Sequence, residues 1–270
     1  MLTYPNIDPV ALSLGPVKVH WYGLMYLLAF LCAWGLASYR AKQRDGWTAD
    51  MVSDLVFYGA LGVVLGGRIG YVLFYEFGKF LENPLWLFQV WTGGMSFHGG
   101  FLGVMIAMLF WCKKYQKTWF QTLDFIAPCV PTGLMFGRIG NFIGGELYGR
   151  QVQDLSYPFG MIFPTDPLGL VRHPSQIYQA LCEGLILFII LWWFSAKPRP
   201  RMAVSALFLM GYGVARFFME FFRQPDADQG FILFGWMTKG QILTVPMLLI
   251  GLWMMWYAYQ KKIYDWQIKK

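Results

Sequence analysis

Charged residues are scarce in this 270-residue chain: they make up 14% of it, whereas a soluble domain carries roughly 25%. Hydrophobic residues account for 57%. The polar residues are therefore too few to cover a water-soluble globule, and a membrane protein is expected. The net charge of +7 does not indicate a nucleic-acid partner, because the basic residues are spread along the chain between long apolar runs.

Cysteine and the common catalytic motifs are also sparse. The four cysteines are scattered through apolar segments without a CxxC pair, which favours small buried thiols over a metal site or a nucleophile. The chain contains no HExxH, P-loop or GxSxG motif, and its three histidines lack metal-ligand spacing. We therefore expect neither a metal nor a cofactor.

Long uncharged runs are abundant instead. A membrane-spanning helix needs about 20 mainly apolar residues, and seven segments meet this requirement: 20–39, 54–75, 95–112, 122–143, 175–196, 202–222 and 239–260. The apolar segment 83–93 is too short to cross and is predicted to lie at the membrane interface. The predicted fold is all-α, a single seven-helix membrane domain over residues 1–270.

Basic residues predict how these spans are oriented. The segments after the first, third, fifth and seventh spans hold 13 of the 22 Lys and Arg residues, against six in the opposite segments. The positive-inside rule then places the N-terminus outside and the C-terminus in the cytoplasm. Loop 144–174, between spans four and five, is rich in glycine and proline and is predicted to form a small extracytoplasmic cap.

Three arginines interrupt the apolar runs: Arg68, Arg138 and Arg216, in spans two, four and six. A charge at a helix centre costs roughly 2.5–3.5 kcal/mol on insertion scales, so such residues usually face the protein interior. Each lies about 5–7 residues from the outer end of its span, or roughly 8–10 Å at 1.5 Å per residue. His98 and Tyr22 begin spans on the same side, so one polar cluster opening outward is expected.

Two interpretations of this cluster stay open from the residues alone. The arginines could be structural, each neutralised by a carboxylate; the candidates are Glu76, Glu146, Glu183 and Glu220. His98 could likewise be a satisfied histidine at a helix start. Alternatively, the planar guanidinium forks bind phosphate, which near the outer leaflet belongs to a phospholipid headgroup. A lipid-modifying enzyme and a lipid or anion transporter both fit that second interpretation.

A sequence motif narrows the choice. Residues 137–150, GRIGNFIGGELYGR, resemble the signature of bacterial phosphatidylglycerol–prolipoprotein diacylglyceryl transferases. Further stretches agree with that family: HWYG at 20–23, GGMSFHGG at 93–100, RHPSQ at 172–176 and the segment from 216 to 225. The chain departs from the family's usual residues at Gly144, where Asn is typical, and at Gln179, where Glu is frequent.

The resemblance implies a reaction and its partners. A diacylglyceryl group would pass from phosphatidylglycerol to the lipobox cysteine thiol of a prolipoprotein, forming a thioether and releasing glycerol phosphate. The enzyme would be a multi-pass protein of the bacterial inner membrane, with its site toward the outer leaflet. The nucleophile belongs to the substrate, which agrees with the lack of a catalytic cysteine or serine motif. The resemblance implies no metal and leaves the oligomeric state open.

Residue roles follow as hypotheses. Arg138 and Arg216, which match arginines regarded as essential in the family, are predicted to bind the phosphate more strongly as the leaving group gains charge. His98 is the candidate general base, because imidazole titrates near neutral pH. The other candidate substrate-binding residues are Tyr22, Asn141, Arg68 and Glu146, of which the last two rank lower.

Overall fold

The structure, a computed structural model, describes residues 2–5, 7–15, 17–154, 156–225, 230 and 232–267. The chain is mostly helical, as predicted. It divides into two compact units: residues 1–33 with 123–267, and residues 34–122. Helix α1 (Trp21–Lys42) begins in the first unit and ends in the second.

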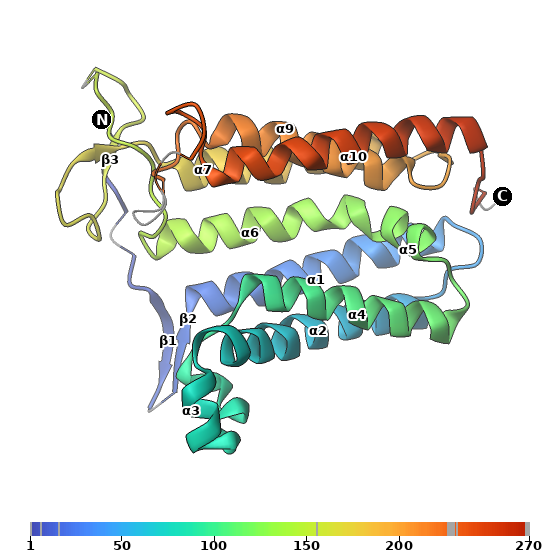
Figure 1. Cartoon of the computed structure of the whole chain (residues 1–270), viewed down its shortest axis with the longest axis horizontal. Helices are drawn as coiled ribbons and strands as arrows, with labels where there is room; N and C mark the ends of the chain where they lie inside the picture. The colour runs from blue at the N-terminus through green and yellow to red at the C-terminus, as the bar shows by residue number, and fades with distance from the viewer. Residues whose placement is uncertain are drawn as a thin grey trace. The chain divides into compact units, whose positions relative to one another are not determined.

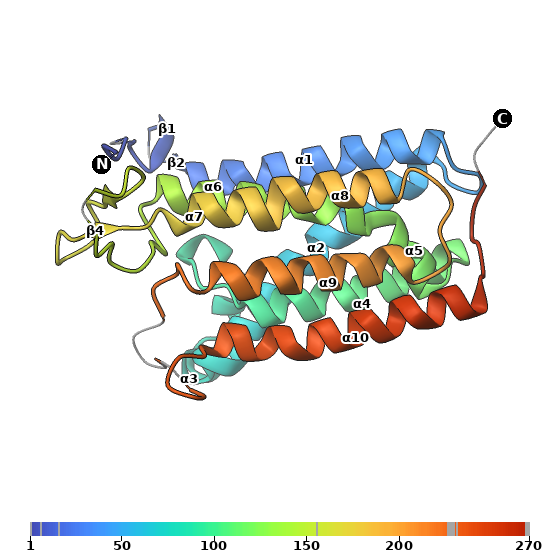
Figure 2. The ribbon, with the colours of Figure 1, turned by 90° about the horizontal axis from the view of Figure 1, so that it is seen from above.

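The first unit holds most of the helices. They are α5 (Trp119–Ile126), which begins in the second unit, the 3-10 turn η3 (Ala127–Cys129), α6 (Val130–Ile143), α7 (Ser175–Gln179), the π-helical η4 (Ala180–Ile186), α8 (Leu187–Phe194), α9 (Ala203–Met219) and α10 (Lys239–Lys261). Helices α7, η4 and α8 form one continuous rod (Figure 2). Helices α9 and α10 lie side by side in both views (Figures 1 and 2).

Helices α9 and α10 pack as an antiparallel pair because glycines let them approach closely. A Cβ added at Gly213 would lie 3.1 Å from Leu248, and one at Gly251 would lie 2.7 Å from Met210. Small residues at such positions bring helix backbones together in membranes, where burial of apolar surface gives no extra driving force. The pairing fixes the end of α9, which carries Arg216, against the start of α10.

The start of α9 is capped by a carboxylate from another helix. Met202 precedes α9 with φ 77° and offers no capping side chain. Asp124 of α5 accepts hydrogen bonds from the backbone N–H of Met202 at 2.7 Å and of Ser205 at 2.8 Å, and one from the Ser205 hydroxyl at 2.5 Å. A carboxylate at a helix N-terminus satisfies its free N–H groups and opposes the helix dipole.

The second unit is built on α2 (Ala49–Tyr75) and α4 (Phe97–Tyr115), joined by α3 (Phe77–Glu82), η1 (Pro84–Phe88) and η2 (Val90–Thr92). Glycines line the contact between α2 and α4. A Cβ at Gly66 would lie 2.3 Å from the Gly99 carbonyl oxygen, and one at Gly103 would lie 2.1 Å from that of Gly62. Any larger side chain at these positions would push the two helices apart.

Two short β-hairpins accompany the helices, and the sequence analysis did not predict them. Strands β1 (Val10–Leu14) and β2 (Val17–His20) pair antiparallel, so that His20 ends a strand and α1 begins at Trp21. Strands β3 (Met161–Ile162) and β4 (Val171–Arg172) pair within loop 144–174. Strands of two to five residues are too short for an alternation of apolar and polar residues to stand out.

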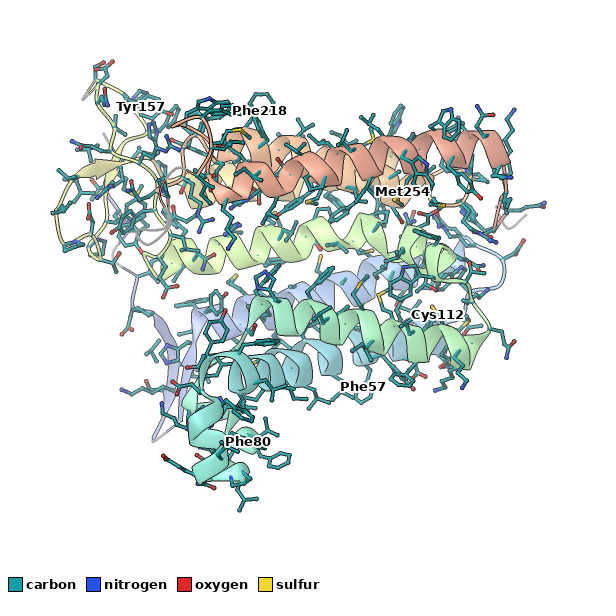
Figure 3. The ribbon with its side chains drawn as sticks, in the orientation of Figure 1. Phe57, Phe80, Cys112, Tyr157, Phe218 and Met254 are labelled. Atoms are coloured by element: carbon teal, nitrogen blue, oxygen red, sulfur yellow. The ribbon has the colours of Figure 1, made fainter. Side chains whose placement is uncertain are left out.

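The helix surfaces are apolar on the outside. Figure 3 shows Phe57 on α2 and Phe218 on α9, which are 62% and 57% exposed, and many other large apolar side chains are exposed along the helices. Monomeric soluble proteins rarely expose large contiguous apolar surfaces. Four helices, Trp21–Lys42, Ala49–Tyr75, Ser175–Phe194 and Lys239–Lys261, are long and apolar enough to cross a membrane. All seven predicted spans are largely helical, with shifted ends.

Candidate active site

Arg138 and Arg216 approach one buried carboxylate in the first unit. The Glu183 side chain is completely buried, and its oxygens lie 3.7 Å from Arg138 Nη2 and 3.8 Å from Arg216 Nη1. Both distances are too long for direct hydrogen bonds, although they allow strong attraction inside a protein. Two of the three arginines that were predicted to form one cluster therefore approach the same glutamate.

Local backbone geometry positions Glu183. It lies in the π-helical turn η4, and π-helical turns inside α-helices are frequent at functional sites. The next residue, Gly184, packs directly on α6: a Cβ there would lie 2.6 Å from the Met135 side chain. This close approach brings Glu183 beside Arg138, which is one turn further along α6 than Met135.

Arg216 has a second carboxylate partner. Glu220, one turn later, places Oε2 at 2.8 Å from Arg216 Nη2. The hydroxyl of Thr238, the N-cap of α10, donates to Glu220 Oε1 at 3.0 Å. A Cβ at Gly240 would lie 2.8 Å from the same oxygen, so the glycine leaves room for the carboxylate. The first turn of α10 thus holds Glu220, and Glu220 holds one side of the Arg216 guanidinium.

The segment after α6 closes the site from the cap side. Arg150 donates through Nε to the Arg223 carbonyl at 3.0 Å and through Nη2 to the Glu220 carbonyl at 3.2 Å. Its neighbour Gly149 packs tightly between two backbone segments, since a Cβ there would lie 2.5 Å from the carbonyl oxygens of both His173 and Phe222. Burial lowers the pKa of Arg150, which stays charged at neutral pH.

The positive charges outnumber the negative ones around this cluster. Arg223 interacts electrostatically with both Arg138 and Glu183. With Arg150 beside Glu220, and with Glu146 near Arg138 through Tyr22, four arginines face three glutamates, which leaves a formal charge of +1. Such a site favours a dianion over a neutral molecule.

Several buried polar atoms here have no hydrogen-bond partner among the described residues. They are Gln176 Oε1, Gln179 Nε2, both Glu183 oxygens, Arg216 Nη1 and Glu220 Oε2. Buried polar atoms are nearly always hydrogen-bonded in folded proteins, so a group of unpaired ones marks a place for a polar ligand. Residues 176, 179 and 183 recur every three or four positions and share one face of the rod.

Tyr22, Asn141 and Glu146 belong to the same unit as the two arginines. A Cβ at Gly140 would lie 3.0 Å from the Tyr22 ring, so α1 packs directly on the arginine-bearing part of α6. Tyr22 interacts electrostatically with both Arg138 and Glu146. Asn141 is buried, and its carbonyl accepts the N–H of Glu146 at 2.9 Å. These three predicted residues thus lie around Arg138.

Arg68 and His98 belong to the second unit. His98 is exposed in the first turn of α4, next to the N-cap Ser96. The Arg68 guanidinium is enclosed by the segment that leads into α4. The predicted meeting of Arg68 and His98 with Arg138 and Arg216 stays a prediction. Among the described residues no group of three or more His, Cys, Asp or Glu side chains is arranged to hold a metal ion.

Comparison with known proteins decides the family. The family model for prolipoprotein diacylglyceryl transferase matches residues 9–257. The chain belongs to the prolipoprotein diacylglyceryl transferase family. It is 93% identical over 270 residues to the phosphatidylglycerol–prolipoprotein diacylglyceryl transferase of Acinetobacter baumannii (strain ACICU), covering 100% of this chain and 99% of that protein.

Other members of this transferase family are also similar over nearly their whole length. The enzyme of the same name from Acinetobacter baylyi is 89% identical over 266 residues, covering 98% of this chain and 97% of that protein. That of Psychrobacter arcticus is 62% identical over 289 residues, covering 98% of both. The chain is therefore a transferase, and a transporter is not favoured.

The sequence alone revealed only part of this site. Glu183 was one of several possible ion partners, whereas in the structure this single carboxylate lies between both arginines. Arg150 and Gln176 had no predicted role, although both occur in the quoted motifs. The position of Arg150 at the end of the GRIGNFIGGELYGR motif was the available signal.

Proposed function

We propose that this transferase moves the diacylglyceryl group of phosphatidylglycerol to a prolipoprotein cysteine, using the cluster around Arg138, Glu183 and Arg216 as its phosphate site. The function follows from membership of the family and from relatives named for this reaction. The thiol loses its proton, and the sulfur forms a bond to the glyceryl carbon. The bond from that carbon to the phosphate oxygen breaks, and glycerol phosphate leaves with the electron pair.

The charge on the phosphate increases during this step. A phosphodiester carries one negative charge, and the departing phosphate monoester carries up to two. A site in which arginines outnumber glutamates therefore stabilises the transition state more than the bound lipid, which is the condition for a faster chemical step. The observation that carries the proposal is the approach of Arg138 and Arg216 to the same buried carboxylate.

Glu183 has a geometric role in this proposal. It attracts both guanidinium groups without hydrogen-bonding to either, so Arg138 and the Nη1 group of Arg216 keep N–H groups available to phosphate oxygens, while Arg216 Nη2 lies against Glu220. Without it, the two like charges would repel each other in a poorly solvated environment. Tyr22, Asn141 and Glu146 are assigned to orient the lipid around Arg138, and His98 is assigned as the base that accepts the thiol proton.

The proposed architecture is a single seven-span membrane domain with the N-terminus outside, the C-terminus in the cytoplasm, and residues 144–174 as an extracytoplasmic cap. Four helices that meet the length and composition of spans support it, and so does the distribution of 13 of 22 Lys and Arg residues on one side. The phosphate site then faces the outer leaflet of the inner membrane, where a prolipoprotein presents its lipobox cysteine after export.

A transfer assay tests the reaction and the site together. Purified protein in detergent is incubated with phosphatidylglycerol and a lipobox peptide, and the peptide is examined for a mass gain of one diacylglyceryl unit. Arg138→Ala is expected to lower the rate on the order of 100-fold or more, as removal of one donor to a developing anion does in other enzymes. Arg138→Lys should also lower the transfer rate, because an ammonium group lacks the planar fork of a guanidinium.

Lys42→Ala is the control, since it removes an exposed cation from the far end of α1 and should keep the activity. No mass gain with folded wild-type protein would refute the reaction. Full activity of Arg138→Ala would refute the phosphate site and leave the reaction standing.

A further inference from the structure

The Arg68 guanidinium is enclosed by the polypeptide chain. The residue is 2% exposed, and its three nitrogens, which carry five N–H groups, donate to five oxygen acceptors. Nε donates to the Leu87 carbonyl at 2.9 Å, and Nη2 donates to the Trp86 carbonyl at 2.7 Å. The other acceptors are the carbonyl oxygens of Gly93 and Gly94 and the hydroxyl of Thr92.

These acceptors are all neutral. Among the described residues no carboxylate forms an ion pair with Arg68, and its guanidinium carbon lies 4.4 Å from the centre of the Trp86 ring. A cation over an indole face is stabilised most strongly when it is poorly solvated. The guanidinium therefore organises backbone oxygens and an aromatic ring and has no N–H group left for a lipid phosphate.

Segment 86–94, which encloses the Arg68 guanidinium, leads directly into α4, and contacts with α2 fix the path of this segment. Gly93 and Gly94 have φ 81° and 82°, which other residues adopt only with strain. A Cβ at Gly94 would lie 2.3 Å from the Tyr71 ring. The N–H of Ser96 donates to the carbonyl of Gly67, the residue before Arg68, at 2.9 Å.

The first turn of α4 is set by the same contacts. The Ser96 hydroxyl accepts the N–H of Gly99 at 3.2 Å and caps the helix. A Cβ at Gly70 would lie 2.7 Å from the Gly99 Cα, so α2 and α4 touch through backbone atoms here. His98 lies between these two fixed residues, 96 and 99, and its backbone position follows from theirs.

We propose that Arg68 is a positioning residue: it folds segment 86–94 around its guanidinium and thereby places His98 at the start of α4. The inference rests on the proposed role of His98 as the base. This proposal gives Arg68 a different role from Arg138. Both arginines lie in a Gly-Arg-Ile-Gly pattern, but Arg68 donates to carbonyl groups of the protein's own backbone.

Three variants separate positioning from charge. Arg68→Lys keeps the charge, but one ammonium with three N–H groups cannot replace a fork that serves five acceptors. Arg68→Gln removes the charge as well. Trp86→Leu leaves the donors and carbonyls in place and removes only the ring face. Lys113→Gln, an exposed cation at the other end of α4, is the matched control.

The expected result is a selective loss of the chemical step. Both Arg68 variants should lower kcat about 10- to 100-fold, in line with the cost of misplacing a reacting group by an ångström. Their KM for phosphatidylglycerol should stay within about twofold of the wild type, because phosphate binding is unaffected. Amide hydrogen exchange in segment 86–96 should become faster in the folded, detergent-purified Arg68 variants. Trp86→Leu should change both kcat and the exchange rate less than the Arg68 variants do.

A double variant links the effect to His98. If Arg68 acts through His98, adding Arg68→Lys to His98→Gln should lower kcat little further. A fully active Arg68→Lys would overturn the proposal in favour of a pure charge effect. A raised KM with unchanged kcat would overturn it in favour of phosphate contact. Full activity of His98→Gln would remove the proposed base, and faster exchange in Arg68→Lys would then support the ordering of the segment alone.

Discussion

At the scale of single residues, Arg68, Arg138 and Arg216 differ in the groups that surround their guanidinium N–H donors. Arg68 is surrounded by neutral oxygens of its own chain, whereas Arg138 and Arg216 are attracted to one carboxylate at distances too long for hydrogen bonds. A guanidinium whose donors are all used stabilises structure, and one held by charge alone can still bind an anion. The same residue type at the same predicted depth thus has two different kinds of surroundings.

Glu183→Gln tests the residue between the two arginines. The amide has almost the same volume and no charge, so Arg138 and Arg216 lose their shared partner and repel each other. We expect kcat to fall about 10- to 100-fold from the altered geometry, without a rise in KM, since the site becomes more positive. Removing one partner of a buried ion pair should also lower the free energy of unfolding by roughly 3–5 kcal/mol.

Initial rates against phosphatidylglycerol concentration and thermal unfolding in detergent measure these two effects. Glu76→Gln is the control: it removes the same charge from an ion pair with Lys79, whose side chain is 59% exposed. Such a surface pair contributes only about 0–1 kcal/mol. A wild-type kcat for Glu183→Gln would show that the arginines need no carboxylate between them.

At the scale of elements, the sequence predicted the helices well and the strands not at all. Apolar runs of about 20 residues are long enough to stand out, and each predicted span is largely helical. The π-helical turn Ala180–Ile186 had no visible signal, because it depends on how α6 and the rod of α7 and α8 pack through Gly184. The hydrogen-bond acceptors of Arg68 could not be predicted either, because backbone carbonyl groups carry no sequence signature.

The cap, residues 144–174, holds its own ion pair. Asp166 accepts from Arg172 Nε at 2.8 Å and Nη2 at 3.1 Å, and both side chains are buried. The backbone N–H groups of Leu168 and Leu170 also donate to this carboxylate, at 3.2 and 3.1 Å. Arg172, with these N–H groups, lowers the pKa of Asp166 to about 2.

Acid should therefore loosen the cap. A carboxyl whose pKa is lower in the folded state stabilises that state fully above its unfolded pKa of about 3.9. This contribution should disappear as the pH falls from about 4 through about 2. Asp166→Asn should loosen the cap already at neutral pH, because it leaves Arg172 buried without a charge partner.

Amide hydrogen exchange of residues 156–174 across this pH range measures the effect. Asp154→Asn is the matched control: Asp154 is exposed, and among the described residues its carboxylate accepts hydrogen bonds from Ser156 alone, which an asparagine oxygen can still accept. If both variants exchange equally, the ion pair has no special role in the cap.

At the scale of the whole molecule, the charge distribution predicts one orientation. Four segments hold 13 of the 22 Lys and Arg residues, and all four lie on the predicted cytoplasmic side. In this predicted orientation, the ends of α6 and α9 that carry Arg138 and Arg216 would face the outer leaflet, which is where the proposed function needs them. A site facing the cytoplasm would meet prolipoproteins before export.

Cysteine labelling tests this orientation. Ser156→Cys in the cap and Gln43→Cys after α1 are both exposed positions, introduced separately into a background in which the four native cysteines are replaced by alanine. A membrane-impermeant maleimide should label position 156 in intact cells and position 43 only after permeabilisation. The reverse pattern would invert the topology and place the arginine cluster on the side where phosphatidylglycerol and an exported lipobox cysteine do not meet.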